Sequence, residues 1–443
     1  METEQPTIAA IATAIGGGVG VIRLSGKNAL AIANKHFTGL PTDPAPRHLY
    51  HGWFRDSQML PLDEGLCAFM KSPNSYTGED VIELHLHGGL LSLNRCMDVL
   101  WKAGVQPAGP GDFTRRAFLN GKMDLTRAEA VADMIAARTH RALNQARSHL
   151  HGQLATTVTE AREKIIGIRA RIEVNIDFVE EDVPLYPGDV LAHEASDIGN
   201  SLEALANTFH RGRLWRDGAR VVLVGHPNAG KSSLFNTLCG HDRAIVTATA
   251  GTTRDTLEET IDIAGIPVLL VDTAGLRETD DEIETAGMDR TKRAFSAADL
   301  VVVLKDRSDP AHEEPLALPN GVPLLQVDSK VDLQQAGKRT GDMAISTVTG
   351  QGIEALKQTI AHRLGGEDRL NDELTIGRQR HQVALQHSAD ALTRAAAALA
   401  DQQPPELAAV DIQEAADALA ELVGATTNED VLDRLFSSFC IGK

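Results

Sequence analysis

The stretch VVLVGHPNAGKSS, residues 221–233, decides the fold of the central part of this chain. It matches the pattern G-x-x-x-x-G-K-S, with Gly225, Gly230, Lys231 and Ser232 in the required places. In such a loop the glycines let backbone N–H groups surround phosphates, Lys231 reaches the β- and γ-phosphates, and Ser232 ligates Mg²⁺. A β-branched run precedes the pattern and a helix-forming run follows it. That context distinguishes a phosphate loop from a glycine-rich turn in an unrelated α/β protein.

Two later segments carry the residue types that a bound nucleoside triphosphate and its Mg²⁺ require. Thr253, in the run GTTRD, is a candidate second Mg²⁺ ligand on a loop that orders around the γ-phosphate. The apolar run at 268–271 predicts a buried strand that delivers Asp272 towards Mg²⁺, with the Gly275 N–H facing the γ-phosphate. These parts stand in the order that a GTPase needs.

The base-reading position is occupied by Ser329-Lys330-Val331-Asp332, where GTPases carry Asn-Lys-x-Asp. Asp332 can accept from guanine N1–H and the exocyclic amine. Adenine offers an acceptor at N1 and no amine, so the carboxylate rejects ATP. The run Ser346-Thr347-Val348 replaces the usual Ser-Ala-Lys, and the Thr347 N–H is expected to face guanine O6.

Two departures from the GTPase pattern affect affinity and catalysis. Ser329 lacks the amide that Asn offers the base, so we expect modest affinity and retained specificity through Asp332. Leu276 stands where Ras-type enzymes carry the Gln that orients the attacking water. The acidic run at 277–284 is the expected source of a replacement.

Composition limits the class of protein. The 443 residues are 42% hydrophobic and 23% charged, as in soluble globular proteins, and the net charge of −18 argues against nonspecific nucleic-acid binding. No apolar run reaches the length of a membrane span, and no signal peptide is evident. The four cysteines show no C-x-x-C spacing. We therefore expect a cytoplasmic protein with reduced thiols.

Residues 1–120 predict a mixed α/β domain, with strands at 19–25, 66–70 and 81–86 and helices at 29–37 and 90–103. In the alternating run VIELHLH, His85 and His87 share a face. A polar strand face and a metal site are both compatible with them, and no third ligand is apparent nearby.

Long helices follow from residue 121. Thr126 and Glu129 form a capping box, and further helices are expected through Ile176, at 189–210, 385–400 and 408–423, and after a cap near Thr427. The segment 138–151 carries three arginines and three histidines, which fits an RNA-contacting face or a solvated helix face. The helical blocks match in character, which predicts one helical domain (121–215 and 368–443) interrupted by an inserted, Ras-like P-loop GTPase domain (216–367).

The whole chain resembles a known family, the bacterial tRNA-modifying GTPases of the MnmE/TrmE type. The resemblance rests on GVGVIRLSG at 18–26, YTGEDVIELHLHGG at 76–89, DFTRRAFLNGKMDLTRAEAVAD at 112–133, the GTPase motifs above, and the terminal FCIGK. It implies a GTPase that installs a carboxymethylaminomethyl or aminomethyl group at carbon 5 of the tRNA wobble uridine, U34. It also implies a homodimer and an FAD- and NADH-dependent partner protein, joined as a heterotetramer or larger.

The resemblance further implies an N-terminal domain similar to folate-binding aminomethyltransferases, with a 5-formyl- or 5,10-methylene-tetrahydrofolate as one-carbon donor. By motif, Arg23, Glu83, Lys122 and Lys443 would contact it. Cations suit a glutamate-tailed folate and a carboxylate suits the donor edge of the pterin. For Cys440, burial and chemistry both remain open.

In the GTPase domain, the family makes Asn228 a ligand of K⁺, which takes the place of an arginine finger, and Glu284 the residue that orients the attacking water through a bridging water. The K⁺ is further held near Thr247, Thr249 and Thr252. Glu284 and Lys231 are thus the predicted catalytic residues, and Ser232 and Thr253 the predicted Mg²⁺ ligands. The predicted GTP-binding set is Asn228, Ala229, Gly230, Lys231, Ser232, Ser233, Thr247, Thr249, Gly251, Thr252, Thr253, Asp272, Thr273, Ala274, Gly275, Ser329, Lys330, Asp332, Ser346, Thr347 and Val348.

Two other functions remain open. One is a ribosome-assembly switch of the Era type, which would need a basic RNA-binding domain, and none is evident. The other is a folate-dependent one-carbon transferase with a regulatory GTPase domain.

Overall fold

The computed structural model describes residues 5–177, 186–241, 257–272, 297–308, 321–333, 341–366, 374–426 and 428–443. Contacts divide the chain into two compact units. Unit 1 comprises residues 1–132, 149–159 and 420–443, and unit 2 comprises residues 133–148 and 160–419. Each unit therefore combines segments that are far apart in the sequence.

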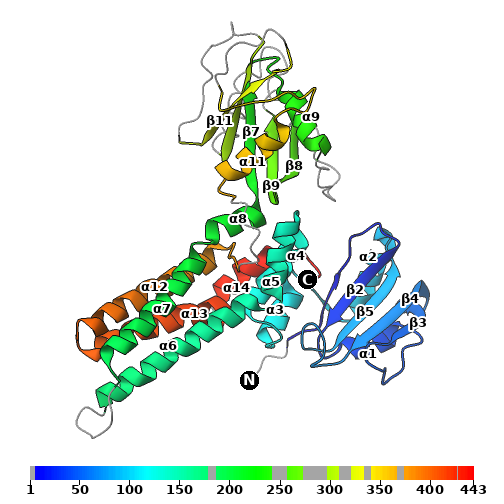
Figure 1. Cartoon of the computed structure of the whole chain (residues 1–443). Helices are drawn as coiled ribbons and strands as arrows, with labels where there is room; N and C mark the ends of the chain where they lie inside the picture. Colours follow the sequence, from blue (N-terminus) through cyan, green and yellow to red (C-terminus); the bar gives the residue numbers. More distant parts are fainter. Residues whose placement is uncertain are drawn as a thin grey trace, which may run out of the picture. The chain divides into compact units, whose positions relative to one another are not determined.

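Unit 1 is built on a six-stranded sheet in the order β3-β4-β5-β2-β1-β6 (Figure 1). Neighbouring strands are antiparallel, except that β1 and β6 are parallel. Side chains alternate along β5, where Ile82, Leu84 and Leu86 are buried and His85 and His87 lie on the other face. The strands are β1 (Ile8–Ile11), β2 (Val19–Ser25), β3 (Leu49–Arg55), β4 (Pro61–Met70), β5 (Val81–His87) and β6 (Gln106–Pro107).

Two helices, α1 (Ala29–His36) and α2 (Leu90–Lys102), pack on the buried face of this sheet (Figure 1). Ala33 of α1 and Leu93 and Leu100 of α2 join Ile22 and Leu84 in one apolar core. All five N-terminal elements predicted from the sequence are confirmed, with β4 extending further towards its N-terminal end than expected.

The C-terminal end of the chain belongs to the same unit. Leu432, Leu435 and Phe436 of α14 (Glu429–Ser437) pack with Leu125 and Ala128 of α4 (Leu125–Ala136). The predicted capping box at Thr126 is wrong, because the Asp124 carboxylate accepts from the Arg127 N–H at 3.0 Å and Thr126 lies inside the helix. The last helix is capped by Asn428, which accepts from Asp430 N, and the predicted Thr427 lies outside the described residues.

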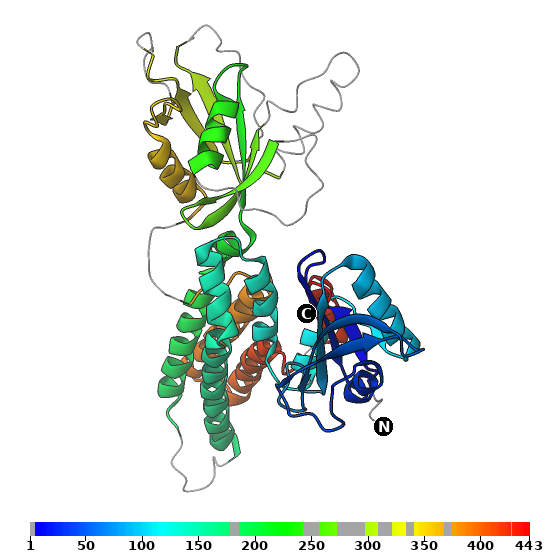
Figure 2. The same cartoon turned by 90° about the vertical axis from the view of Figure 1, so that its right-hand side faces the viewer.

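Unit 2 contains a second sheet (Figure 2). It has six strands in the order β12-β11-β10-β7-β9-β8. The sheet is parallel except for β8, which pairs antiparallel with β9. Helices α9 (Lys231–His241) and α11 (Ile353–Arg363) share one apolar core with the strands. The strands are β7 (Ala219–Gly225), β8 (Leu257–Ile263), β9 (Ile266–Asp272), β10 (Leu300–Asp306), β11 (Leu324–Ser329) and β12 (Met343–Ala344). Because β7, β9 and β11 run parallel, their carboxyl ends lie at one edge of the sheet.

Helices that precede this sheet in the sequence pack against helices that follow it. In α7 (Gly188–Ala206), a Cβ built on Gly199 would lie 3.5 Å from Ala389 O and from the Leu392 side chain of α12 (Gln379–Ala400). Ser388 of α12 donates to Ala415 O of α13 (Pro405–Val423) at 3.1 Å. The remaining helices are α3 (Asp112–Leu119), α5 (His140–Leu150), α6 (Gln153–Asp177) and α8 (Phe209–Asp217).

Two predictions about the helices need correction. The expected helix at 189–210 is two helices, α7 and α8. The helix expected at 408–423 begins earlier, at Pro405, because proline fits the first turn, where its missing N–H has no intrahelical partner. The RNA-contacting or solvated face expected at 138–151 stays a prediction, and Arg138 within it is exposed. Arg138 donates to Thr260 at 3.3 Å, and the Arg141 guanidinium lies 5.6 Å from the Trp215 ring centroid.

No helix within the described residues is both long enough and apolar enough to span a membrane.

Candidate functional sites

The phosphate loop connects β7 to α9, as the sequence predicts. Gly225 must be a glycine, because a Cβ there would lie 2.6 Å from Leu304 O. Asn228 and Gly230 both adopt left-handed backbone conformations, with φ of 61° and 92°. The Lys231 Nζ donates to Gly225 O at 3.0 Å and His226 O at 2.9 Å. The ammonium therefore lies over the loop, where a bound phosphate would be.

Two oxygen-bearing side chains meet beside this loop. The Ser232 hydroxyl, on the first turn of α9, donates to Asp272 Oδ2 at 2.9 Å. Asp272 ends β9 and is fully buried. Oxygen donors are the ligands that Mg²⁺ prefers, so this pair fits a magnesium ion, held through Ser232 with Asp272 behind it.

The loop after β11 carries the predicted base-reading residues. Ser329 is buried, and its hydroxyl lies 2.7 Å from Ala229 O. Lys330, with φ of 57°, is paired with Asp306 at 2.6 Å. Asp332 is exposed at the loop surface, where a base can reach it.

The second predicted base loop follows β12. Ser346 is fully buried, and its hydroxyl accepts from Thr349 N at 3.1 Å. Val348 is 84% exposed, so it shapes the turn without packing in the core. This loop lies next to the first one, because Val331 N donates to Ile345 O at 3.3 Å.

Asp306, which the sequence reasoning missed, supports the base-reading loop from β10. Burial would raise the pKa of this carboxyl, but hydrogen bonds from Lys330 and Ser308 outweigh burial and hold its pKa below the ordinary value. The signal in the sequence was a carboxylate two residues after the apolar run Leu300–Leu304.

Several predicted nucleotide residues lie outside the described residues. They are Thr247, Thr249, Gly251, Thr252, Thr253, Thr273, Ala274, Gly275 and Glu284, together with Leu276.

A second polar site lies in unit 1, where the C-terminal tail reaches β2. Arg23 of β2 pairs with Glu83 of β5 at 2.8 Å and donates to Gly442 O at 3.1 Å. The Arg23 guanidinium also lies 5.7 Å from the Tyr76 ring centroid and 5.6 Å from that of Phe113. Arg23 and Glu83 therefore largely neutralise each other, and Arg23 holds the tail.

The last three residues are held by backbone contacts. Phe113 N donates to Lys443 O at 3.2 Å, and Ile441 forms a bridge with Pro110. Gly442, with φ of 94°, allows this approach, because a Cβ there would lie 2.7 Å from Ile11 O. Three of the four predicted folate residues are thus brought together: Arg23, Glu83 and Lys443.

Lys122 lies apart from that group, and its Nζ donates to Pro73 O at 2.8 Å. Pro73 belongs to the same loop as Tyr76, which lies against Arg23.

Cys440 is exposed and lies beyond the end of α14, so burial does not explain the presence of a cysteine at this position. The other three cysteines are also free, and burial raises the pKa of Cys67 and of Cys96 to about 12.

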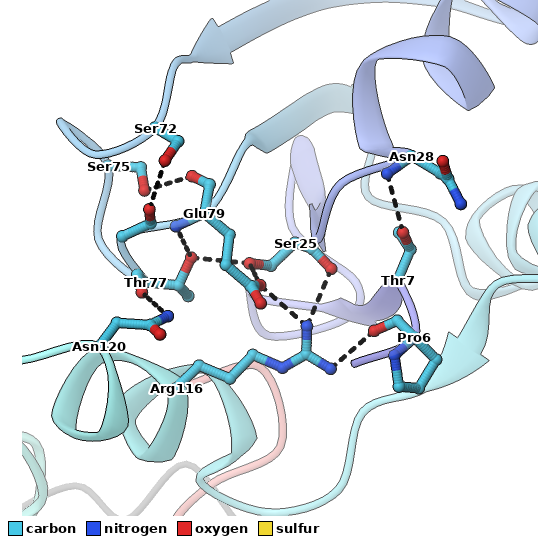
Figure 3. Close-up of polar contacts among 11 residues, drawn as sticks. Pro6, Thr7, Ser25, Asn28, Ser72, Ser75, Thr77, Glu79, Arg116 and Asn120 are labelled. Atoms are coloured by element: carbon cyan, nitrogen blue, oxygen red, sulfur yellow. Dashed lines mark hydrogen bonds and ion pairs between the residues drawn. The ribbon is translucent and has the colours of Figure 1, made fainter. Parts of the chain in front are cut away.

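A buried network that the sequence reasoning missed holds the 72–80 loop in place (Figure 3). Arg116 of α3 donates to Glu79 at 2.8 Å and to Pro6 O at 2.8 Å. Ser25 donates to the same Glu79 carboxylate at 2.6 Å and lies 2.7 Å from the Thr77 hydroxyl. Arg116 lies on the face of α3 that carries Phe113 and Ala117, and a charge in such an apolar row is the signal that could have revealed it.

The two β5 histidines do not gather metal ligands. His87 Nδ1 lies 2.6 Å from Asp63, whose hydrogen bond raises the His87 pKa, and His85 lies 3.6 Å from Glu83. No group of three or more potential ligating side chains occurs among the residues that the structure describes. The polar strand face is therefore the better interpretation.

The phosphate loop on the central strand of a mostly parallel sheet, with the Ser232–Asp272 pair beside it, defines a P-loop nucleoside triphosphatase. Comparison with known proteins narrows the class. Two family models match: the MnmE helical domain over residues 125–440 and the N-terminus of the GTP-binding protein TrmE over residues 7–122.

Relatives match over the full length. The tRNA modification GTPase MnmE of Syntrophus aciditrophicus is 42% identical over 457 residues, covering 99% of each chain. That of Aquifex aeolicus is 40% identical over 448 residues, covering 98% of this chain and 99% of the relative. A solved structure of Aquifex aeolicus Era bound to GDP·AlF₄⁻ covers 39% of this chain and 66% of its own, with 25% identity and a TM-score of 0.27. The chain belongs to the MnmE family of tRNA modification GTPases, and it is an enzyme of the GTP-hydrolysing class.

Proposed function

We propose that this chain hydrolyses GTP to drive modification of carbon 5 of the wobble uridine, U34, in certain tRNAs. The observation that carries the proposal is the phosphate loop with Lys231 and the Ser232–Asp272 pair, in a chain that matches a tRNA modification GTPase MnmE over 99% of its length. The group added is a carboxymethylaminomethyl or aminomethyl group.

The nucleotide site binds GTP with Mg²⁺. Lys231 stabilises charge on the β- and γ-phosphates, and Ser232 and Thr253 hold the metal. Asp332 selects guanine through its N1–H and amine. Its exposure in the 329–332 loop is consistent with a base entering from solvent.

K⁺ supplies the positive charge that an arginine finger supplies in other GTPases. Its ligands are Asn228, Thr247, Thr249 and Thr252, and Glu284 orients the attacking water through a second water. Of these four K⁺ ligands, the structure describes Asn228, which is exposed on the phosphate loop.

A tetrahydrofolate derivative, 5-formyl or 5,10-methylene, supplies the one-carbon unit in unit 1. Glu83 binds the donor edge of the pterin, and Lys122 and Lys443 attract the glutamate tail. Arg23 contacts the folate as well, and it keeps Glu83 and the tail in position, which its contacts with Glu83 and Gly442 O support.

The wider organisation follows the family. The GTPase domain, 216–367, is inserted between two halves of a helical domain, 121–215 and 368–443, which the packing of α7 against α12 supports. Residues 1–120 form the folate-binding and dimerisation domain. The protein is a cytoplasmic homodimer that works with an FAD- and NADH-dependent partner in a heterotetramer or larger assembly.

Nucleoside analysis of tRNA tests this function. In a strain from which the gene is deleted, the modified wobble uridine should disappear, and a plasmid copy of the chain should restore it. An unchanged nucleoside profile would contradict the proposal. Ribosome-assembly defects with normal tRNA would favour the Era-type switch, and lost one-carbon transfer with normal tRNA would favour the folate transferase.

A further inference from the structure

The buried Ser329 hydroxyl is directed at the phosphate loop. It ends β11, is 4% exposed, and its Oγ lies 2.7 Å from Ala229 O and 3.1 Å from Lys305 O. A hydroxyl has one proton to donate, and the shorter contact is the one to Ala229. The residue that stands in the base-reading motif therefore contacts the loop that binds phosphate.

Ala229 lies in the part of that loop with the least common backbone conformations. It lies between Asn228 and Gly230, both in left-handed backbone conformations. A non-glycine residue in that conformation is strained and persists only where its surroundings hold it. Ala229 itself is fully buried, so its carbonyl depends on partners within the protein.

The position of Ser329 is itself fixed from β10 and from the next residue. Ser329 O accepts from Arg307 N at 3.2 Å, and Lys330 is paired with Asp306 at 2.6 Å. A Cβ built on Gly230 would lie 4.0 Å from the Ser329 side chain, in ordinary van der Waals contact. Ser329 thus contacts the phosphate loop through its hydroxyl, and its backbone is held by the N–H of Arg307.

We propose that Ser329 is a positioning residue for the nucleotide, which fixes the phosphate loop at Ala229 and leaves base recognition to Asp332. This inference rests on the nucleotide site proposed above. It follows that Ser329 sets the affinity for the phosphates of any purine nucleotide, whereas Asp332 sets the preference among bases.

The test compares GDP with IDP, which lacks the exocyclic amine, in equilibrium binding to the purified full chain. Ser329→Ala should weaken both nucleotides by about fivefold, the equivalent of one neutral hydrogen bond. The ratio of the two affinities should stay within twofold of the wild-type ratio. Ser329→Thr, which keeps a hydroxyl, should restore binding, and Asp332→Asn should change the ratio. In GTP hydrolysis, Ser329→Ala should raise KM and leave kcat within twofold.

The matched control is Thr359→Ala, which removes a hydroxyl that donates to Ala355 O within α11 at 2.8 Å. It should leave both affinities unchanged. Binding stoichiometry separates weak binding from misfolding, because a misfolded fraction lowers the number of sites and not their affinity. Wild-type GDP affinity in Ser329→Ala, or a changed GDP/IDP ratio, would overturn the inference. Failure of the wild-type chain to bind GDP would instead contradict the proposed function.

Discussion

At the scale of single residues, Asn228 is the most informative position in the nucleotide site. Its φ of 61° is unusual for a residue with a side chain, and the side chain is exposed at the loop. Backbone strain at such a position persists where function or packing holds it. Its amide oxygen is the only predicted K⁺ ligand within the described residues.

We therefore expect GTP hydrolysis to be stimulated by K⁺ and not by Na⁺, because the proposed cage is too wide for Na⁺. Asn228→Ala should lose this stimulation, which is worth about 10³ to 10⁵ in rate where an arginine finger supplies the charge. Alanine also strains a left-handed position. Asn228→Gly is the control, since it removes the oxygen without strain and should lose the stimulation as well. Equal wild-type rates in K⁺ and Na⁺, measured by phosphate release, would disprove the cation role.

The roles of single residues could be predicted only where the residues belong to a contiguous sequence motif. The glycines and Lys231 follow from a contiguous pattern, so their positions were predictable. The Ser329–Ala229 contact joins residues that are distant in the sequence, and the motif reading considered only what Ser329 lacks towards a base. The Arg116–Glu79 pair was missed for the same reason.

At the scale of elements, the C-terminal tail is a structural part of unit 1. It is held by Arg23 and Phe113 through the carbonyl groups of Gly442 and Lys443. The sequence predicted that the tail would meet Arg23, but only through the family resemblance. Helix ends were less predictable, because Asp124 and Asn428 compete with nearby Thr126 and Thr427 as caps.

Deletion of residues 441–443 should abolish tRNA modification and leave GTP hydrolysis within twofold of wild type. The tail lies at the proposed folate site, and it carries no motif of the nucleotide site. Lys443→Ala is the matched control, because it keeps both carbonyl contacts and tests the side chain alone. Nucleoside analysis and phosphate release measure the two activities. Loss of both activities on deletion would point to a general folding role for the tail.

The end of α1 makes the N-terminal sheet sensitive to acid. His36 is 3% exposed and its Nε2 has no hydrogen-bond partner, while Nδ1 lies 3.2 Å from Arg55 O. Burial lowers the pKa of His36 below its ordinary value of 6.5, despite the opposing bond to Arg55 O. Below that value the unfolded chain binds a proton that the folded chain resists, so stability present above pH 6.5 is lost as pH falls.

We expect His36→Gln to reduce this acid sensitivity. The variant should be less stable than wild type at pH 7.5, and the difference should shrink or reverse at pH 5.5. Urea midpoints followed by Trp53 and Trp101 fluorescence, with Trp215→Phe in both proteins, report on unit 1 alone. A stability difference that stays constant between the two pH values would exclude His36 as the cause.

At the scale of the whole molecule, the division into units could not be read from the sequence. Unit 1 joins the first 132 residues to residues 149–159 and to the last 24, 420–443. Such long-range contacts leave no local pattern, whereas strand alternation and helical periodicity do. The net charge of −18 remains consistent with a protein whose partner supplies part of the tRNA contact.

The central claim is that GTP hydrolysis by this chain drives wobble-uridine modification. Its most direct test is the modified nucleoside content of tRNA in a deletion strain that carries either the wild-type chain or Lys231→Ala. Lys231 donates to Gly225 O and His226 O, so its loss could disturb the loop. Circular dichroism and expression level therefore serve as controls for folding. Wild type should restore the modified nucleoside fully, and Lys231→Ala should restore none at equal protein level. Restoration by Lys231→Ala to the wild-type content would contradict it.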